Sequence, residues 1–511
     1  MSVNSQKIAH NKYLSCIALI CVAVFARFYQ IGTESLWLDE SYSLRFSNRS
    51  LLHALTSERT TPPLYYLVLH YWIKVFGQSE VALRSLSAIA SLSAIPLTVY
   101  LGKILFGFRC GLLAAFFLSI SSFQIYYAQE ARAYVFLLPL ILSSSILLVK
   151  ILEDAQISKR WYWIVYVCLS ILAVYTHIYA IFSIAAHNII VLLALMQQSG
   201  KTKGLLSRWI FSQLSILLSF IPWILHMLSE VGSFANERRY LFLKLPQVVF
   251  SLIYGNQLVP IDEQATLNVS ETLLDNAPLL VLAGLPVLLL GANGLCVIQR
   301  KYFSSMFVLL NFLVPLLLSF CITFFVPIFD EGYLIGVSPF LFLFLFSGFA
   351  ENDQKFSHNR KSVYSLILQG AFALLVLLAS IGLYRYYFDT RFGKEQWRDV
   401  ASYIESIAET EDILVFDRYY HDTPYRYYQT LSHKDIKFKE LEKLAPTQVG
   451  YFESEHIEKL LQHTRVWLIK IRSSNDNTES YLKRYYTEVN RKFFSKDKGI
   501  LVVQLLRKEE K

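Results

Sequence analysis

Charged residues are scarce in this chain of 511 residues: they make up 17%, against 54% hydrophobic residues. A soluble domain typically carries about a quarter charged residues, so this composition excludes an ordinary water-soluble protein. Apolar runs such as 278–298 and 306–328 are long enough for helices that cross a hydrocarbon core of ~30 Å, which takes about 20 residues. The sequence therefore predicts a polytopic α-helical membrane protein.

Several motifs are missing as well. The six cysteines lie almost entirely in apolar runs and form no CxxC pair, which excludes a zinc knuckle and a disulfide framework. There is no phosphate-binding GxxxxGKS or GxxxxGKT loop and no GxGxxG after a strand. The net charge of +9 is not clustered in one domain, so we expect no nucleic-acid partner. An activated substrate would then have to come from the membrane.

Hydropathy places the membrane-spanning segments. About eleven helices are predicted, near residues 13–31, 81–106, 111–126, 133–151, 161–177, 178–197, 207–228, 277–298, 305–328, 334–350 and 363–384. The first run lacks a convincing cleavage site, so we interpret it as a retained helix. Basic residues are concentrated in the segments that face the cytoplasm if the N-terminus is inside. We therefore expect a multi-pass protein of the plasma (inner) membrane, with its C-terminal region outside.

The chain divides into two predicted domains. A transmembrane domain is predicted over 1–388, with long outer loops at about 32–80 and 229–276. Within the first loop, residues 62–77 are amphipathic and aromatic, which suits a helix lying in the membrane interface. Three short apolar runs follow later, at 412–416, 466–471 and 500–505. Since these alternate with helical stretches, we predict a small soluble α/β domain over 389–511, on the non-cytoplasmic side.

Two polar segments between apolar runs carry the residues best suited to chemistry. The first contains Asp39 and Glu40 in an aromatic, apolar frame that a solvated loop does not need. A carboxylate partly shielded from water suits a general base. The second contains Glu130 and Arg132, which are two apart and so do not face each other on a helix. The planar fork of arginine suits phosphate oxygens.

Each of these residues also has a structural explanation. Acidic residues belong in wet loops, and Glu130 and Arg132 could form an interfacial ion pair. Tyr127 and Tyr134 could line a pocket or belong to an interfacial aromatic belt. A lone histidine such as His177, at the outer end of the fifth helix, is more often hydrogen-bonded than a ligand. Because Glu130 lies on the same face, these two residues are also a candidate site for a divalent metal ion; no other cofactor is predicted.

Taken in order, the motifs resemble those of a known group. They are Leu36-Trp37-Leu38-Asp39-Glu40, Thr61-Pro62-Pro63-Leu64-Tyr65-Tyr66, Ala82-Leu83-Arg84-Ser85, Tyr127-Ala128-Gln129-Glu130-Ala131-Arg132 and Tyr175-Thr176-His177. Together they are similar to motifs of bacterial lipid-linked-sugar glycosyltransferases with the GT-C fold, a group that includes protein O-mannosyltransferases and aminoarabinose transferases. The match covers residues 10–230 well and the later helices in outline.

The resemblance implies a function. A sugar would move from a polyprenyl-phosphate donor to a lipid, glycan or protein acceptor on the non-cytoplasmic face, among membrane lipids, with inversion. Asp39, beside Glu40, would be the base, Glu130 would orient acceptor or metal, and Arg132 or Arg84 would contact the donor phosphate. The substrate pocket would contain Tyr42, Tyr65, Tyr127, Tyr134 and His177.

One departure from the group concerns residue 332. Members often have an Arg-Tyr-Leu segment entering a late helix, whereas this chain has Gly332-Tyr333-Leu334. Either phosphate recognition would then depend on Arg132, Arg84 or a basic residue of the second long loop, or the chain would use its donor differently. Two other functions stay open: a transporter or flippase of lipid-linked glycans, and a glycan polymerase or ligase. A transporter usually has ionisable residues near the bilayer midplane and repeated halves, whereas here the acids lie at one face and no repeat is visible in the sequence.

Overall fold

The computed structural model describes most of the chain. The described residues are 3–51, 61–153, 159–197, 203–228, 241–259, 274–326, 328–349, 358–409, 412–416, 421–432, 460–471, 478–496 and 499–508. They form two compact units. The helical unit comprises Met1–Tyr29, Arg49–Gly77 and Ala82–Arg385, and the sheet unit comprises Gln30–Asn48, Gln78–Val81 and Tyr386–Lys511.

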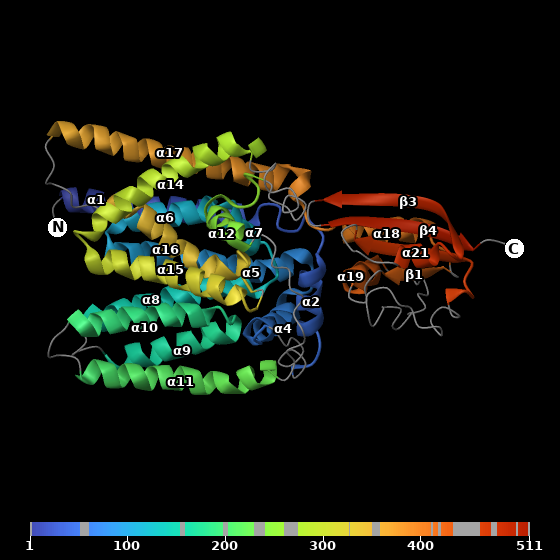
Figure 1. The fold of residues 1–511 in the computed structure, drawn as a ribbon, viewed down its shortest axis with the longest axis horizontal. Helices are drawn as coiled ribbons and strands as arrows, with labels where there is room; N and C mark the ends of the chain where they lie inside the picture. Colours follow the sequence, from blue (N-terminus) through green and yellow to red (C-terminus); the bar gives the residue numbers. More distant parts are fainter. Residues whose placement is uncertain are drawn as a thin grey trace. The chain divides into compact units, whose positions relative to one another are not determined.

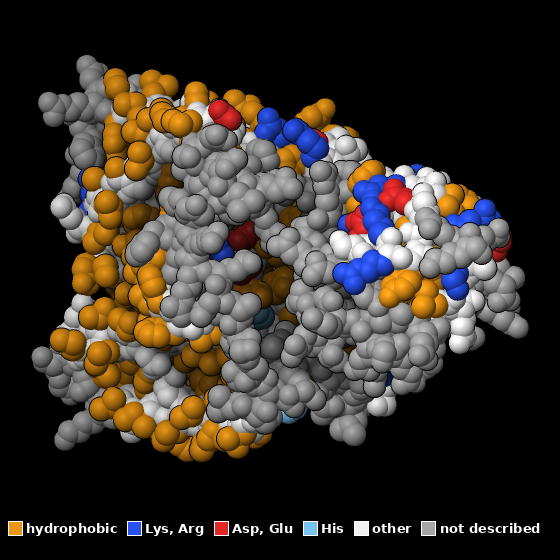
Figure 2. All heavy atoms as spheres, turned by 45° about the vertical axis from the view of Figure 1, so that its right-hand side comes forward, with side chains coloured by type: hydrophobic (Ala, Val, Ile, Leu, Met, Phe, Trp, Pro, Cys, Tyr) orange, Lys and Arg blue, Asp and Glu red, His pale blue; other side chains and the backbone are white. Residues whose placement is uncertain are grey.

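The helical unit is a bundle of long apolar helices (Figure 1). Its elements are α1 (Val3–Phe28), α4 (Leu64–Phe76), α5 (Glu80–Leu105), α6 (Phe108–Ile120), α7 (Ser122–Ala128), η1 (Ala133–Phe136), α8 (Leu137–Glu153), α9 (Arg160–Thr176), α10 (Ala180–Gln197), α11 (Lys203–Leu228), α12 (Leu241–Tyr254), α14 (Ala277–Ile298), α15 (Tyr302–Thr323), η2 (Gly332–Val337), α16 (Ser338–Leu345), η3 (Ser347–Phe349) and α17 (His358–Phe388). Hydrophobic side chains cover much of its surface in Figure 2, as expected for helices that face lipid.

The polytopic helical class is confirmed. Among the described residues, eight helices are long and apolar enough to cross a membrane, or nine if the bent pair α6 and α7 forms one span. Two shorter apolar helices are Arg160–Thr176 and Gly332–Leu345. The predicted total of eleven crossings and the orientation of the chain remain predictions. Most of the second long loop lies outside the described residues, apart from α12 and the residues beside it.

The segment predicted as one helix at 111–126 is two helices. α6 and α7 are bent by 62° at their junction. Ser121 caps α7 by accepting a hydrogen bond from the backbone N–H of Gln124, with Oγ 3.4 Å away. The hydroxyl of Ser122 donates to the carbonyl of Tyr254 at 2.8 Å. These polar side chains give the junction the partners that an unbroken helix would not need.

Small residues let α5 and α6 approach closely. A Cβ added to Gly102 would lie 2.3 Å from the Cα of Gly111, and one added to Gly111 would lie 2.4 Å from the carbonyl oxygen of Val99. Close backbone approach at small residues is a common means of helix association in membranes. The end of α5 and the start of α6 are therefore in close backbone contact.

The sheet unit confirms the predicted small C-terminal α/β domain. Its elements are α2 (Leu38–Ser47), η4 (Thr390–Phe392), α18 (Trp397–Ile407), β1 (Ile413–Phe416), α19 (Asp422–Ser432), β2 (Arg465–Ile471), α21 (Thr478–Leu482), β3 (Tyr486–Lys496) and β4 (Gly499–Lys508). The strand order is β1-β2-β4-β3, with β1 and β2 parallel and the other pairs antiparallel. Helices α18 and α19 pack on one face around Trp397 and Trp467.

The sheet unit also contains residues from the first long loop. The sequence places the domain boundary after residue 388, whereas the compact unit combines Tyr386–Lys511 with Gln30–Asn48 and Gln78–Val81. The hydroxyl of Tyr428 in α19 accepts from the N–H of Leu36 at 2.6 Å and donates to Glu80 at 3.0 Å. The guanidinium of Arg398 bonds Glu80 at 2.5 Å. These polar contacts attach the first loop to α18 and α19.

Candidate active site

Helix α7 ends in a turn that carries Glu130, and buried polar side chains hold this turn in place. The amide of Gln129 donates to the carbonyl of Arg27 at 3.0 Å. Arg27 itself is fully buried, and its guanidinium donates to the carbonyls of Leu118 and Ser119, each at 3.2 Å, at the end of α6. A cation at a helix C-terminus is favourable. The turn is therefore tied to the end of α1 and, through Arg27, to α6.

The turn presents Glu130 and Arg132 differently. Glu130 is 1% exposed, whereas Arg132 is half-buried. The N–H of Arg132 donates to the carbonyl of Glu130 at 2.9 Å, and its Nε and Nη2 donate to the hydroxyl of Tyr134 at 3.3 and 3.1 Å. The guanidinium carbon also lies 5.3 Å from the centre of the Tyr134 ring. Arg132 is thus oriented by Tyr134 and keeps a partly open cationic surface.

Tyr134 is the centre of an aromatic cluster, defined here as Tyr127, Tyr134, His177, Tyr179 and Tyr333. Its ring lies 5.6 Å from Tyr127, 5.8 Å from His177 and 5.5 Å from Tyr333, measured between centroids. His177 and Tyr179 lie 4.9 and 5.2 Å from Tyr333. The structure thus brings together three of the predicted site residues, Tyr127, Tyr134 and His177. Tyr179 and Tyr333 were not among the predicted site residues.

His177 follows the last residue of α9 and is held in its neutral form. Burial, with a further effect from the positive charge of Arg132, lowers the pKa of His177 to about 3. Its Nδ1 accepts a hydrogen bond from the N–H of Tyr179 at 3.3 Å. Neutral imidazole is the form that binds metals. Within the described part of the chain, no group of three or more His, Cys, Asp or Glu residues could hold a metal ion.

Two further carboxylates lie near this cluster, just before η2. Tyr127 is within electrostatic range of Glu331, Asp330 and Glu130. Asn256 donates to Glu331 at 2.9 Å, and the N–H of Gly332 donates to Asp330 at 2.8 Å. The surrounding protein displaces water from the carboxylate of Asp330, and this desolvation, together with the negative charge of Glu331, raises its pKa. Part of the Asp330 side chain still lies at the surface.

The glycine at position 332 has a steric reason. A Cβ on Gly332 would lie 2.6 Å from the hydroxyl oxygen of Tyr127 and 2.8 Å from two of its ring carbons. The phenol of Tyr127 therefore occupies the space that a side chain at 332 would need. An arginine at this position, as in the resembling group, would not fit beside Tyr127.

The other predicted acids lie in the sheet unit, in the first turn of α2. Glu40 is fully buried and forms an ion pair with the buried Lys394 at 3.1 Å. Its second oxygen accepts from the N–H of Trp37 at 3.3 Å, which caps the helix. Asp39 is partly exposed, and so is Tyr42, whose ring lies 5.7 Å from the guanidinium of Arg45.

Two predicted site residues are buried in the helical unit. Arg84 is 1% exposed in the second turn of α5. Tyr65 is fully buried in α4, where its ring packs edge-on against Phe136 at 5.3 Å. These positions favour a packing role for Tyr65 and leave Arg132 as the more accessible of the two predicted phosphate-binding arginines.

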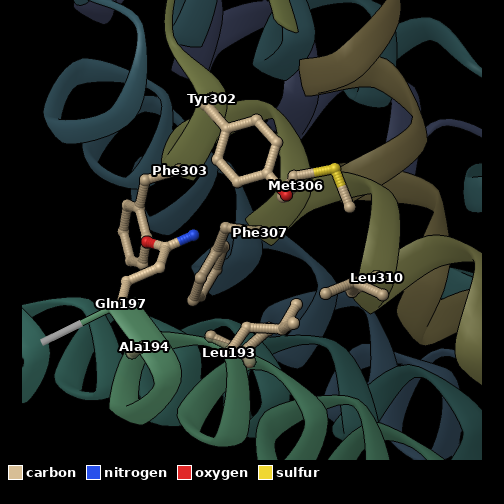
Figure 3. Close-up of a pocket in the computed structure, with 9 residues that line it drawn as sticks. Leu193, Ala194, Gln197, Tyr302, Phe303, Met306, Phe307 and Leu310 are labelled. Carbon is tan, nitrogen blue, oxygen red and sulfur yellow. The ribbon is translucent and has the colours of Figure 1, made fainter.

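An apolar pocket lies elsewhere, between α10 and α15 (Figure 3). Its lining residues are Ile190, Leu193, Ala194, Gln197, Tyr302, Phe303, Met306, Phe307 and Leu310. These belong to the end of α10 and the start of α15, whereas His177 precedes α10 and Asp330 follows α15. The pocket is therefore separate from the aromatic cluster and its carboxylates.

Known proteins are similar to this chain in sequence over part of its length and in fold over nearly all of it. Residues 60–226 match the family model described as dolichyl-phosphate-mannose-protein mannosyltransferase. No curated protein sequence matches the chain. ArnT from Cupriavidus metallidurans in the apo state aligns with a TM-score of 0.58 and 12% identity, over 97% of this chain and 98% of ArnT.

Two further structures support the comparison. ArnT from the same organism bound to undecaprenyl phosphate has a TM-score of 0.55 at 12% identity, over 96% of this chain and 97% of ArnT. The Archaeoglobus fulgidus oligosaccharyltransferase in complex with Zn and sulfate also has a TM-score of 0.55 at 12% identity, over 94% of this chain and 72% of that one. The resemblance inferred from the motifs is thus confirmed: the chain has the GT-C fold and resembles the membrane glycosyltransferases that use lipid-linked sugars.

Proposed function

We propose that this chain is an integral membrane glycosyltransferase that moves a sugar from a polyprenyl-phosphate donor to a lipid, glycan or protein acceptor. The main support for this proposal is the turn that contains Glu130 and Arg132. It joins a partly open guanidinium to a buried carboxylate and an aromatic cluster, in a fold shared with ArnT. One of the ArnT structures binds undecaprenyl phosphate, which supports a lipid-phosphate donor here.

The chemistry needs positive charge on the leaving phosphate and a base for the attacking hydroxyl or amine. Arg132, oriented by Tyr134, would contact the phosphate oxygens and stabilise the charge that develops on them. Asp39 would accept the proton of the nucleophile, and Glu130 would orient the acceptor. Direct attack on the anomeric carbon, opposite the phosphate, would invert its configuration. Since the ion pair with Lys394 occupies Glu40, we assign the base to Asp39.

The aromatic cluster would bind the sugar, since aromatic faces suit the apolar faces of sugar rings. Neutral His177 would act there as a hydrogen-bonding residue, and together with Glu130 it is the candidate for any divalent metal ion. The reaction would occur on the non-cytoplasmic face of the plasma (inner) membrane, with the N-terminus cytoplasmic and the sheet unit outside.

The distribution of buried charge favours transfer over transport. Among the described residues, the buried Lys, Arg, Asp and Glu side chains of the candidate spans are Arg27 and Arg84. The buried His187, in the middle of α10, hydrogen-bonds Ser145 and Tyr166. Arg27 is the penultimate residue of α1 and Arg84 the fifth of α5, so both lie near helix ends. Transporters commonly have such groups near the bilayer midplane.

The test is sugar transfer from radiolabelled polyprenyl-phosphate donors in membranes, with matched expression of wild type, Asp39→Asn, Glu130→Gln and Arg132→Gln. Glu153→Gln, at the exposed end of α8, is the control and should transfer as wild type does. We expect loss of transfer in the first two variants with donor still bound, and weaker donor binding in the third. Full activity in all three would refute the mechanism. No transfer by wild type, across several donors and acceptors, would favour a flippase.

A further inference from the structure

Two consecutive residues of the C-terminal chain bind the residues on either side of Asp39. Lys394 forms the buried ion pair with Glu40, at 3.1 Å. Glu395 accepts a hydrogen bond from the backbone N–H of Leu38, the first residue of α2. The backbone at Asp39 is therefore attached on both sides to one short segment that precedes α18.

Both of these C-terminal residues are buried, at 4% exposure each. Glu395 also accepts from the indole N–H of Trp397 at 2.5 Å, and Trp397 is part of the core between α18 and the sheet. Burial, and to a smaller extent the negative charge of Asp39, raise the pKa of Glu395, whereas the contacts to Trp397 and His421 lower it. The carboxylates of Asp39 and Glu395 thus lie within electrostatic range of each other.

A buried ion pair is a poor means of stabilising a fold, because desolvation of the charges offsets much of their attraction. Apolar side chains of similar volume would hold α2 on α18 and α19 equally well. Charged, hydrogen-bonded partners additionally define the direction and the register in which α2 lies against the segment at Lys394 and Glu395. The backbone of Lys394 is itself fixed, since its N–H donates to Glu34 at 3.2 Å, and the N–H of Arg398 donates to Ser35 at 3.2 Å.

We propose that Lys394 and Glu395 are positioning residues for Asp39, which they hold by binding Glu40 and the backbone of Leu38. The inference rests on the proposed function, in which Asp39 is the base. Displacement of a catalytic group by about 1 Å can lower a rate about 100-fold. Loss of either contact should therefore lower kcat and leave donor binding, which the proposal assigns to the other unit, largely unchanged.

The experiment compares purified full-length variants in detergent, measuring kcat, donor KM and thermal unfolding. Lys394→Met should lose about 10- to 100-fold in kcat, with donor KM within about twofold of wild type. Lys394→Arg, which keeps the charge, and the reversed pair Glu40→Lys with Lys394→Glu should each recover part of that loss. Arg391→Gln is the matched control, because Arg391 is nearby in sequence and its exposed side chain forms an ion pair with Asp389.

A neutral double variant, Glu40→Gln with Lys394→Met, covers the case in which the single variant does not fold, because no unpaired charge remains buried. If this variant folds and transfers sugar at the wild-type rate, the ion pair does not position Asp39 and the inference is wrong. Hydrogen exchange of Leu38–Ser47 gives an independent measurement: faster exchange in a folded, slow variant supports the inference, and unchanged exchange contradicts it. If Asp39→Asn is fully active, the proposed function fails instead; if only that variant is inactive, the inference alone fails.

Discussion

The contact between Gly332 and Tyr127 predicts that Gly332→Ala destabilises the helical unit. The new Cβ would lie 2.6 Å from the Tyr127 hydroxyl oxygen, closer than the 3.0 Å that real Cβ atoms observe. The ring cannot retreat easily, because it packs edge-on against Phe123 and Tyr126, each at 5.0 Å, and against Tyr134 at 5.6 Å. Overpacking of this kind typically costs about 1–3 kcal/mol. The unfolding free energy should fall by that amount.

Displacement of the Tyr127 ring should also disturb the proposed site, because Tyr127 contacts Tyr134 and Tyr134 orients Arg132. We therefore expect Gly332→Ala to lower transfer as well as stability. Thermal unfolding in detergent and transfer from a radiolabelled donor measure the two effects. Gly370→Ala is the control: nothing lies within 4 Å of its added Cβ, so this variant should be as stable as wild type or up to about 1 kcal/mol more stable.

Removal of the ring should relieve the clash. Tyr127→Ala is itself destabilising, but in this background Gly332→Ala should cost little, so the double-mutant cycle should show a coupling of about 0.5–3 kcal/mol. Additive effects of the two substitutions would refute the reasoning, and so would a Gly332→Ala variant with wild-type stability and transfer. Gly332→Arg with Tyr127→Ala then tests directly whether an arginine can replace the phenol at this position.

Three further predictions concern other parts of the molecule. Gly111→Ala forces a Cβ to 2.4 Å from the carbonyl of Val99, a backbone atom that cannot rotate away, so we expect a loss of about 3 kcal/mol and less monodisperse protein on size exclusion. Because the folded-state pKa of His177, about 3, lies below the 6.5 usual for histidine, its stabilising contribution is complete above pH 6.5 and is lost as the pH falls toward 3. The slope of the unfolding free energy with pH, followed by urea unfolding, should reach about 1.4 kcal/mol per pH unit and be shallower in His177→Asn. Tyr428→Phe removes the acceptor of the Leu36 N–H, and this amide should exchange faster with deuterium.

Hydropathy predicted the helical unit well because lipid-facing helices must be apolar along their whole length. Elements of the other unit were harder to predict. Strand β3 was missed, since its sequence has few hydrophobic residues, does not alternate regularly and contains Glu488, Arg491 and Lys492. It lies at the edge of the sheet, and charged side chains on edge strands are a common protection against aggregation. A polar edge strand therefore resembles a loop in sequence.

Helix α2 was also missed, although a signal for it exists. Its first turn contains Asp39 and Glu40, which favour a helix N-terminus, and the carboxylate of Glu40 accepts from the backbone N–H of Trp37, the residue before the helix. What no local pattern could indicate is the partner of Glu40, because Lys394 is 354 positions away in the sequence. The sequence thus singles out the acid pair but could not separate the buried, paired carboxylate from the partly exposed one.

The motifs include three of the five residues of the aromatic cluster, but they do not indicate how each side chain is oriented. Tyr127, Tyr134 and His177 come from separate segments and meet in one cluster. Arg84 belongs to an equally convincing motif and is buried. A motif shows only which residue types are present. Whether a residue is buried depends on how its helix is rotated against neighbouring helices, and this rotation is set by contacts with residues distant in the sequence.

The break between α6 and α7 explains why so many buried polar side chains near the site have no part in the proposed chemistry. A helix that ends inside a membrane exposes backbone groups that lipid cannot satisfy. At this break Arg27 binds the last carbonyls of α6, Ser121 caps α7, and Gln124 donates from α7 to Ser338 at 2.7 Å. Only with these partners can the chain turn within the bundle and present Glu130. The buried polar residues therefore bind the free backbone groups at the break, and in this way they fix the turn that carries the carboxylate of Glu130.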